Sequence, residues 1–393
     1  MNISLHPDFN GSRITLIRSI KNISSTKLAE EIGVTKQTIS QYENNIIPPT
    51  PDRILAISNV LGFPPKFFFE GKPESFSAGL AYCRATTTTA RNIKSRQTHI
   101  DVLKAYIYRF FSQYIDYPSQ DILIQCMKDI SELSDIEQIA NTVRQSLELN
   151  DRPVQNMVYL LQNIGIIVTS FSEEGSHLDA ISHIPILTNQ EGENKCYYFT
   201  TFNTLKTTPA RLNFTLAHEL GHWILGHISS DDKTPADIEY RGNENDANQF
   251  AAAFLLPKEA FLRDLDNPTS LNSYLHLKLK WHVSIAMMIR RAYMLGQLSP
   301  SQYQYLFRQI GIKKWRTCEP GDMEELPSAS LFSMTVDILD ENRIILKNEL
   351  IHYLNQNCFT AKQDTFEFLL GLKSHELDSK PASPEKKIEF KFQ

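Results

Sequence analysis

The sequence is poor in cysteine and contains no long hydrophobic run. Its five cysteines are scattered and form no C-x-x-C pair, so neither a disulfide framework nor a cysteine zinc ribbon is indicated. The longest purely apolar run, Phe250 to Leu256, is far shorter than the roughly 18 residues of a membrane-spanning helix. The N-terminus lacks the charged-then-apolar pattern of a signal peptide. We therefore expect a cytoplasmic protein in a reducing compartment, with no membrane partner.

A strong charge of one sign is also missing. The formal net charge is only -5 over 393 residues, which argues against a general polyanion binder and confines any DNA contact to a local surface. Hydrophobic residues make up 41% and charged residues 22% of the chain, which is ordinary globular usage and excludes disordered and fibrous classes. The length favours about two to four domains.

The hydrophobic pattern predicts an α+β protein that is mostly helical. We expect an all-helical domain over 9–70, a basic connector and helical linker over 71–150, a domain with a small antiparallel sheet over 151–300, and a mixed α/β C-terminal region of unknown role over 301–393. Helical spacing is found over 100–115, 136–147, 153–163, 212–225, 243–256 and 271–295, and short strand patterns over 165–171, 184–187 and 196–200.

The first domain contains a helix, a turn and a second helix over residues 24–43. Gly33 suits the turn, because a helix commonly ends through a left-handed residue that glycine adopts without a steric penalty. Thr35 can then cap the second helix with its hydroxyl. The outward side chains near the start of this helix can contact base edges or phosphates of double-stranded DNA. They are Lys36, Gln37, Thr38, Ser40 and Gln41.

The most informative chemistry is the segment His218-Glu219-Leu220-Gly221-His222. Two residues four positions apart on a helix lie about 40° apart in azimuth and about 6 Å apart in rise. Both imidazoles can therefore hold one metal ion. Glu219 follows the first histidine directly, so it can accept a proton from a water at the ion, which is the general-base role in H-E-x-x-H metallopeptidases.

Catalytic zinc normally takes three protein ligands, and the best third ligand is Glu244. It lies 22 residues beyond His222, at the start of an apolar helix whose alanines permit close approach. Asn248, one turn further on, is placed to hydrogen-bond a ligand histidine. Asp246 is a weaker alternative ligand because it faces away from Glu244 on a helix.

His227 raises a different assignment, the three-histidine pattern H-E-x-x-H-x-x-G-x-x-H. That pattern fails, because it requires glycine at 225 and histidine at 228, where this sequence has Leu225 and Ile228. In a continuing helix, residue 227 would also point about 140° away from residue 222. We expect His227 to have a structural role or to contact a metal-binding residue without binding the metal itself.

The N-terminal segment resembles the XRE family of helix-turn-helix repressors over about residues 14–69. The matching residues are Arg18, Leu28-Ala29, Gly33-Val34-Thr35, Ile39-Ser40, Tyr42-Glu43 and Pro48 or Pro49. The resemblance implies an internal ion pair between Arg18 and Glu43, which makes Glu43 structural. Because the local charge is weak, we expect a homodimer on a two-fold operator.

The metal segment resembles the ImmA/IrrE family of metallopeptidases. The matching residues are Arg211, Phe214, Thr215 and Ala217 through His222, followed by Glu244, Ala247, Asn248, Phe250 through Ala252, Leu255 and Pro257. Leu256 departs from the methionine that is frequent in the family. Together with the XRE segment, the resemblance covers about residues 10–320. It implies that 151–300 is a zincin-like metallopeptidase domain, and family members include peptidases that cleave repressors of mobile elements or stress-response genes.

The sequence thus favours a DNA-binding transcriptional regulator with a metal-dependent endopeptidase domain of the gluzincin-like type. The ion is Zn²⁺ or another divalent transition metal, and the substrate is a repressor, another regulatory partner or the protein itself. Two alternatives stay open: a regulator whose metal domain senses a ligand or partner without hydrolysis, and an antitoxin-like interaction module. Tyr240, Arg241 and His183 are candidates for stabilising an oxyanion.

Overall fold

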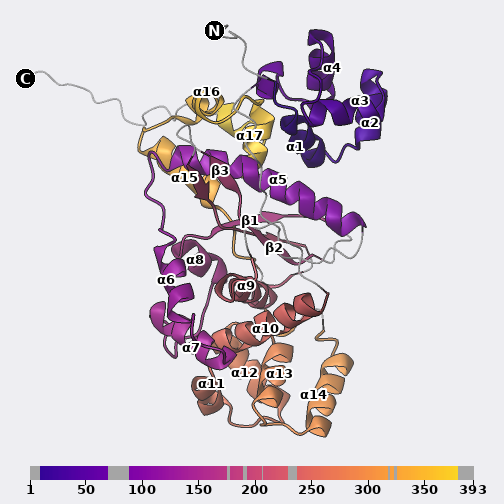
Figure 1. The fold of residues 1–393 in the computed structure, drawn as a ribbon. Helices are drawn as coiled ribbons and strands as arrows, with labels where there is room; N and C mark the ends of the chain where they lie inside the picture. Colours follow the sequence, from indigo (N-terminus) through magenta and orange to yellow (C-terminus); the bar gives the residue numbers. More distant parts are fainter. Residues whose placement is uncertain are drawn as a thin grey trace, which may run out of the picture.

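The structure is a computed structural model and describes residues 9–69, 88–174, 178–188, 193–205, 207–228, 237–316, 319–322 and 325–378. Its helices are α1 (Ser12–Ile20), α2 (Ser25–Ile32), α3 (Lys36–Glu43), α4 (Pro51–Leu61), η1 (Pro65–Phe69), α5 (Thr88–Phe111), α6 (Asp121–Asp129), α7 (Ile136–Ser146), α8 (Met157–Asn163), α9 (Pro209–Ile224), α10 (Asp237–Leu255), α11 (Lys258–Asp264), α12 (Leu271–Trp281), α13 (Ile285–Met294), α14 (Pro300–Ile312), α15 (Leu331–Glu341), α16 (Lys347–Asn357), α17 (Gln363–Leu370) and η2 (Glu376–Asp378). Its strands are β1 (Ile167–Phe171), β2 (Ala180–His183), β3 (Ile186–Thr188), β4 (Asn194–Cys196) and β5 (Phe199–Asn203). The described chain is mostly helical with its strands in the middle, as the sequence predicts (Figure 1).

The N-terminal helices form the expected helix-turn-helix unit. Gly33 ends α2 with φ +65°, in the left-handed region. The Thr35 hydroxyl accepts the backbone N–H of Thr38 and so caps α3. Arg18 Nε lies 2.8 Å from Glu43 Oε1, so the ion pair implied by the XRE resemblance is confirmed.

The central sheet differs from the expected antiparallel arrangement, because it is mixed. Its strand order is β1-β5-β2, with β1 parallel and β2 antiparallel to β5. Residues 172–198 separate β1 from β5, which is more than the dozen or so residues that a parallel connection needs. A separate antiparallel pair joins β3 and β4. Local sequence patterns do not reveal which strands pair. The four-residue strand β2 is not among the strands that the sequence predicts.

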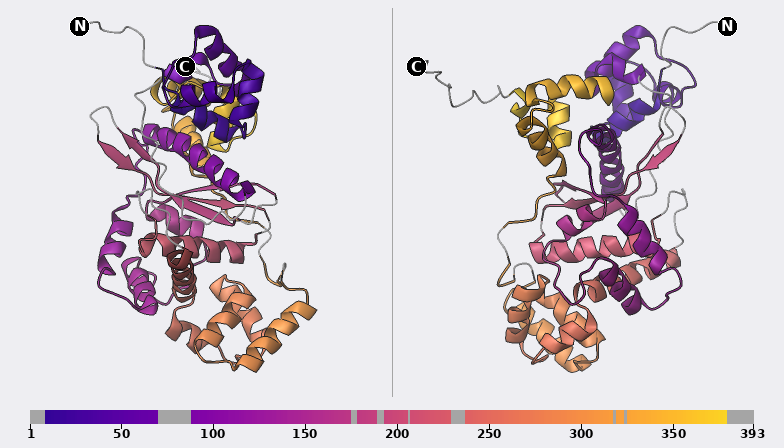
Figure 2. Two further views of the ribbon diagram at one scale, coloured as in Figure 1. Left: turned by 45° about the vertical axis from the view of Figure 1, so that its right-hand side comes forward. Right: turned by 90° about the vertical axis from the view of Figure 1, so that its left-hand side faces the viewer.

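The two faces of the sheet pack into different cores. Along β5, Phe199 joins the core on the α5 side, whereas Phe202 joins the core on the α9 side. Thr201 hydrogen-bonds Asp101 of α5, and Thr200 accepts the indole N–H of Trp223 from α9. Successive side chains of a strand alternate in direction, so both faces are buried. Figure 2 shows the sheet as a middle layer between α5 and α9.

Helix α5 shows that much of the basic connector expected within 71–150 is a packed helix. Within this helix, Gln97, Thr98 and Asp101 are buried. The Ser95 hydroxyl of α5 lies 3.1 Å from that of Ser19 in α1. The helix-turn-helix unit and α5 therefore share one hydrophobic core.

The C-terminal region is also different from the mixed α/β region expected there, because the described residues after 300 contain helices and no strand. Helix α15 buries Phe332, Thr335, Val336 and Leu339, which is the i, i+3, i+4, i+7 spacing of one helical face. Helices α15 to α17 pack beside α5 and the helix-turn-helix unit (Figure 1). The Phe359 ring lies 6.2 Å from that of Phe67.

Two further differences concern the α9-side core. The single helix expected over 271–295 is divided into α12 and α13, because His282 ends α12 with φ +55° and Ser284 caps α13. Helices α6 and α11 were not predicted.

None of the described helices is both long and apolar enough to span a membrane.

Candidate functional site

Helix α9 carries both predicted histidines. The Thr208 hydroxyl accepts the N–H of Arg211 at 3.4 Å, and Pro209 occupies the first turn, where it needs no backbone donor. The apolar side of the helix is fully buried against the sheet and α10. His218 and His222 then lie one above the other, with side chains 16% and 1% exposed.

Helix α10 approaches α9 closely because Gly221 has no side chain. A Cβ at Gly221 would lie 3.1 Å from the Phe250 ring and 3.2 Å from the Ala247 Cα. These distances are tighter than ordinary van der Waals contact, so a larger residue would push α10 outward. Ala247 is one turn after residue 244 on α10, and the close approach therefore brings Glu244 to the histidines.

His218, His222 and Glu244 form a group that could hold a metal ion. The two Nε2 atoms are 3.0 Å apart, and the Glu244 carboxylate oxygens lie 3.4 Å from His218 Nε2 and 3.5 Å from His222 Nε2. Ligand atoms of a tetrahedral ion with bonds of about 2.0–2.1 Å are about 3.3–3.4 Å apart. The spacing and the donor types therefore fit one small divalent cation.

The charges of this cluster also suit a cation. Burial opposes ionisation of Glu244, but hydrogen bonds with His218 and His222 and their charges outweigh it, so the pKa of this carboxyl lies well below its ordinary value. Burial likewise disfavours protonation of His218, yet its hydrogen bond with Glu244 and the charges of Glu219 and Glu244 raise its pKa. The negative charges of Glu219 and Glu244 therefore favour positive charge at His218.

His227 supports the cluster from outside. Its Nδ1 lies 2.9 Å from His222 Nδ1, which leaves His222 Nε2 directed toward His218 and Glu244. Burial, followed by the nearby charge of His222, lowers the pKa of His227 to about 4. A neutral His227 can accept the Nδ1 proton of His222 and keep the Nε2 lone pair available.

Glu219 is 5% exposed, and its Oε2 atom is buried without a hydrogen-bond partner among the described residues. Buried carboxylate oxygens in folded proteins are normally hydrogen-bonded. The unpaired oxygen therefore indicates that a water or a ligand completes this site.

The remaining predicted residues are distributed around α10 and β2. Asn248 donates to the backbone carbonyl of Glu244 at 2.7 Å, and its hydrogen bond contributes to the raised pKa of His218. Among the described residues, Asp246 is outside the metal-binding group. His183 is fully buried beside Asp101 on the α5 side of the sheet, so it does not face the cluster. Arg241 is exposed on α10.

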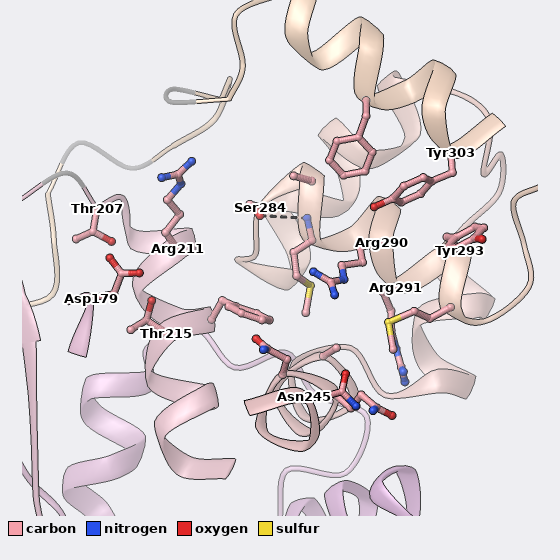
Figure 3. Close-up of a pocket in the computed structure, with 18 residues that line it drawn as sticks. Asp179, Thr207, Arg211, Thr215, Asn245, Ser284, Arg290, Arg291, Tyr293 and Tyr303 are labelled. Carbon is pink, nitrogen blue, oxygen red and sulfur yellow. Dashed lines mark hydrogen bonds between the residues drawn. The ribbon is translucent and has the colours of Figure 1, made fainter. Parts of the chain in front are cut away.

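A cavity of about 960 Å³ lies beside the cluster and was not anticipated from the sequence. Helices α9, α10, α13 and α14 surround it (Figure 3). Phe214 and Thr215 line it one turn before His218, and Asn248 lines it one turn after Glu244. The residues contributed by α13 and α14 carried no recognisable motif, because they meet α9 and α10 only in the folded chain.

The predicted DNA-contacting residues lie on the outer side of α3. Lys36, Gln37 and Ser40 are exposed, whereas Thr38 and Gln41 are half-buried. The Thr38 hydroxyl is 2.9 Å from that of Thr35, so it is engaged in the helix cap. Gln37 and Gln41 are one turn apart and share one face of the helix.

Comparison with known proteins identifies two domains. Residues 17–68 match the family model described as helix-turn-helix, and residues 203–293 match the one described as IrrE N-terminal-like domain. The chain thus carries an XRE-type helix-turn-helix domain and an IrrE/ImmA-like domain, as the two resemblances in the sequence imply.

Two curated relatives match the N-terminal segment. Uncharacterized HTH-type transcriptional regulators of Sinorhizobium medicae and Rhizobium meliloti are each 41% identical over 63 residues, which is 16% of this chain and 45% of theirs. The chain therefore spans less than half the length of these relatives. A crystal structure of Bacillus thuringiensis PlcR in complex with the peptide PapR7 and DNA matches 79% of this chain and 98% of that chain at 12% identity and a TM-score of 0.15. A TM-score this low gives no support for a shared overall fold.

Proposed function

We propose that this protein is a DNA-binding transcriptional regulator and that its IrrE-like domain is a zinc-dependent endopeptidase. The substrate is a repressor, another regulatory protein or the chain itself. The observation that carries the proposal is the meeting of His218, His222 and Glu244 beside the buried, unpaired carboxylate oxygen of Glu219. Imidazole and carboxylate ligands suit Zn²⁺ and also accept other divalent transition metals.

In the proposed mechanism, His218, His222 and Glu244 would hold the ion. When bound, zinc supplies a Lewis acid that polarises the scissile carbonyl. Glu219 would accept the proton of the attacking water and pass it to the leaving amine. His227, through its contact with Nδ1 of His222, would keep the Nε2 atom of that ligand in its unprotonated form.

DNA binding would use α3. On its outer side Gln37 is exposed and Gln41 is half-buried, and Arg18 with Glu43 fixes α1 against α3. Because a single helix-turn-helix domain has few positively charged side chains, we propose a homodimer on a two-fold operator of double-stranded DNA.

Substitution of Glu219 by Gln tests the peptidase part. The Glu219→Gln protein keeps the metal-binding side chains, so it should bind zinc normally and lose cleavage, because an amide cannot accept the proton. We expect one or more regulatory proteins to accumulate intact in cells carrying Glu219→Gln, and to be cleaved by the purified wild-type protein. Glu259→Gln on α11 is the matched control, because Glu259 is exposed.

Two results would contradict the peptidase proposal. One is purified wild-type protein without a bound transition metal even after zinc is supplied. The other is identical protein levels and identical regulation in cells with wild-type and Glu219→Gln protein. The second result, combined with normal zinc binding, would favour a metal domain that senses a partner without hydrolysis.

Substitution of Gln37 and Gln41 by alanine tests the DNA part. An operator is first selected from a random duplex pool with the wild-type protein. The double variant should bind that operator about tenfold or more weakly, because each lost bidentate base contact costs about 1–3 kcal/mol, while its zinc content stays the same. Gln113→Ala, at an exposed residue in the turn after α5, is the control. Unchanged operator binding by the double variant would overturn the assignment of α3.

A further inference from the structure

The cavity beside the metal cluster has an arginine whose charge is not balanced. Arg290 of α13 lines the cavity and is exposed, and it forms no ion pair or hydrogen bond within the described parts of the chain. Figure 3 shows its side chain reaching into the cavity, near Tyr303. An arginine in this position presents a planar set of donors that matches a carboxylate.

The two other arginines that line the cavity are engaged with the protein. Arg211 donates to the Arg316 carbonyl. Arg291 is 1% exposed, and its guanidinium bonds the Glu137 carboxylate and the Leu256 carbonyl. Consecutive residues on a helix point about 100° apart, so Arg291 anchors α13 while Arg290 faces the cavity (Figure 3).

The other cavity walls are mixed: apolar side chains surround Arg290, and Asn245, Asn248 and Gln249 of α10 add polar groups. Phe214, Met287, Met294 and Phe307 line the space around Arg290. Within the described lining, the single acidic residue is Asp179, which lies across the cavity near Thr207 and Arg211 (Figure 3). Because Arg290 is exposed, water partly screens its attraction to an anion, and contacts with the apolar side chains beside it would add to binding. The cavity is therefore complementary to a ligand that combines a carboxylate with bulky apolar groups.

Two observations favour a polypeptide as this ligand. The cavity lies next to the metal cluster, since its lining residues Thr215 and Asn248 are one turn from His218 on α9 and from Glu244 on α10. Asp179 also leads directly into β2, which is the terminal strand of the β1-β5-β2 sheet. An extended chain can pair with such a terminal strand, and a volume of about 960 Å³ exceeds the space that one side chain needs.

We propose that this cavity is the specificity pocket of the peptidase site and that it takes a substrate segment in which Asp or Glu is flanked by bulky apolar residues. Arg290 contacts the acidic side chain, and Phe214, Met287 and Phe307 contact its apolar neighbours. This inference rests on the proposed function, since it names the substrate class of the same site.

The test uses full-length Glu219→Gln protein loaded with zinc, so that peptides are bound without being cut. The probes are two pools of fluorescein-labelled, C-amidated octapeptides with random apolar residues, one with Asp or Glu and the other with Asn or Gln at one fixed position. Fluorescence anisotropy gives the Kd of each pool. We expect the acidic pool to bind about tenfold more tightly, because a charge-assisted hydrogen bond is stronger than a neutral one.

Variants of Arg290 in the same background locate the preference. Arg290→Gln should abolish it, Arg290→Lys should retain part of it, and Arg290→Glu should reverse it toward a third pool with Lys or Arg. Arg308→Gln, an exposed arginine of α14 outside the cavity, should leave it unchanged. Zinc content, measured on each variant, should match that of the parent protein.

Three outcomes would overturn the pocket assignment. They are equal binding of the acidic and amide pools, equal weakening of both pools by Arg290→Gln, and competition by free N-acetylaspartate amide as strong as that by the acidic pool, which would identify a small carboxylate ligand instead. Failure of the proposed function is seen separately, as absent zinc or absent cleavage by the wild-type protein. An Arg290-dependent preference would persist in that case.

Discussion

Two clusters of histidine and carboxylate side chains lie on opposite sides of the central sheet, and they differ in access. On the α9 side, His218, His222 and Glu244 converge, and Glu244 is 31% exposed beside a large cavity. On the α5 side, His183 Nε2 lies 3.6 Å from Asp101 Oδ2, and both side chains are at most 1% exposed. The same residue types therefore form an accessible group in one place and a sealed pair in the other.

Burial has different electrostatic consequences in the two places. On the α5 side it raises the pKa of Asp101 to about 6, against the effects of Lys104 and the Thr201 and Thr169 hydrogen bonds. It lowers the pKa of His183 to about 3. The pair at neutral pH is thus a carboxylate beside a neutral imidazole. On the α9 side the carboxylates outweigh burial and raise the pKa of His218. The candidate site differs from the His183–Asp101 pair because three possible metal ligands converge there beside a cavity.

The largest expected effect is on zinc affinity, which should depend on the α9-side cluster and not on the α5-side pair. Glu244→Ala should weaken zinc binding by far more than the 10–100-fold typical of an outer hydrogen-bond partner, because it removes one of three ligands. His227→Phe, which removes the contact to His222 Nδ1, should weaken it by about 10–100-fold. Competition with a chelating dye measures both affinities.

His183→Gln is the control for the metal titration, since it changes a histidine in the sealed pair. It should leave zinc affinity unchanged. If Glu244→Ala bound zinc as tightly as wild type, or if His183→Gln lost zinc, the distinction between the two clusters would be wrong.

The next effect concerns stability. Asp101 accepts hydrogen bonds from Thr201 at 2.6 Å and from Thr169 at 3.1 Å, and both hydroxyls are buried. Asp101→Ala should lower the free energy of unfolding by about 2–4 kcal/mol, because it leaves buried donors without their acceptor. Urea unfolding followed by tryptophan fluorescence measures the loss. Asp129→Ala, at the end of α6, should cost under about 1 kcal/mol, and an equal cost for both would contradict the role of the sealed pair.

The candidate site was predictable because its information is local. The spacing of His218 and His222 on one helix, and the alanine-rich segment after Glu244, are visible in the sequence, and Gly33 and Thr35 likewise mark their turn and cap. The structure places these residues as helical geometry requires. Their roles in metal and DNA binding, and the four domain limits, stay predictions.

The missed features depend on contacts between distant segments. Helix α5 has a polar composition, and only the folded chain reveals that Asp101 meets Thr169 and Thr201 of two strands. The parallel pairing of β1 with β5 requires knowledge of which strands are neighbours. Arg290 and Arg291 are adjacent residues of the same type, so the sequence does not show which of them forms an ion pair. In the folded chain Arg291 bonds the Glu137 carboxylate.

The smallest expected effect is a pH dependence that comes from the sealed pair. The pKa of His183 in the folded protein, about 3, lies below its ordinary value of 6.5, so the folded state binds fewer protons. The contribution of His183 to stability is therefore complete above pH 6.5 and is lost as the pH falls from 6.5 toward 3. His183→Gln removes this dependence, so the difference in unfolding free energy between wild type and variant should shrink by about 1–2 kcal/mol between pH 7 and pH 5. Urea unfolding of both proteins at each pH measures this difference, and a difference that stays constant would show that His183 becomes protonated without unfolding and that the pair is open to water.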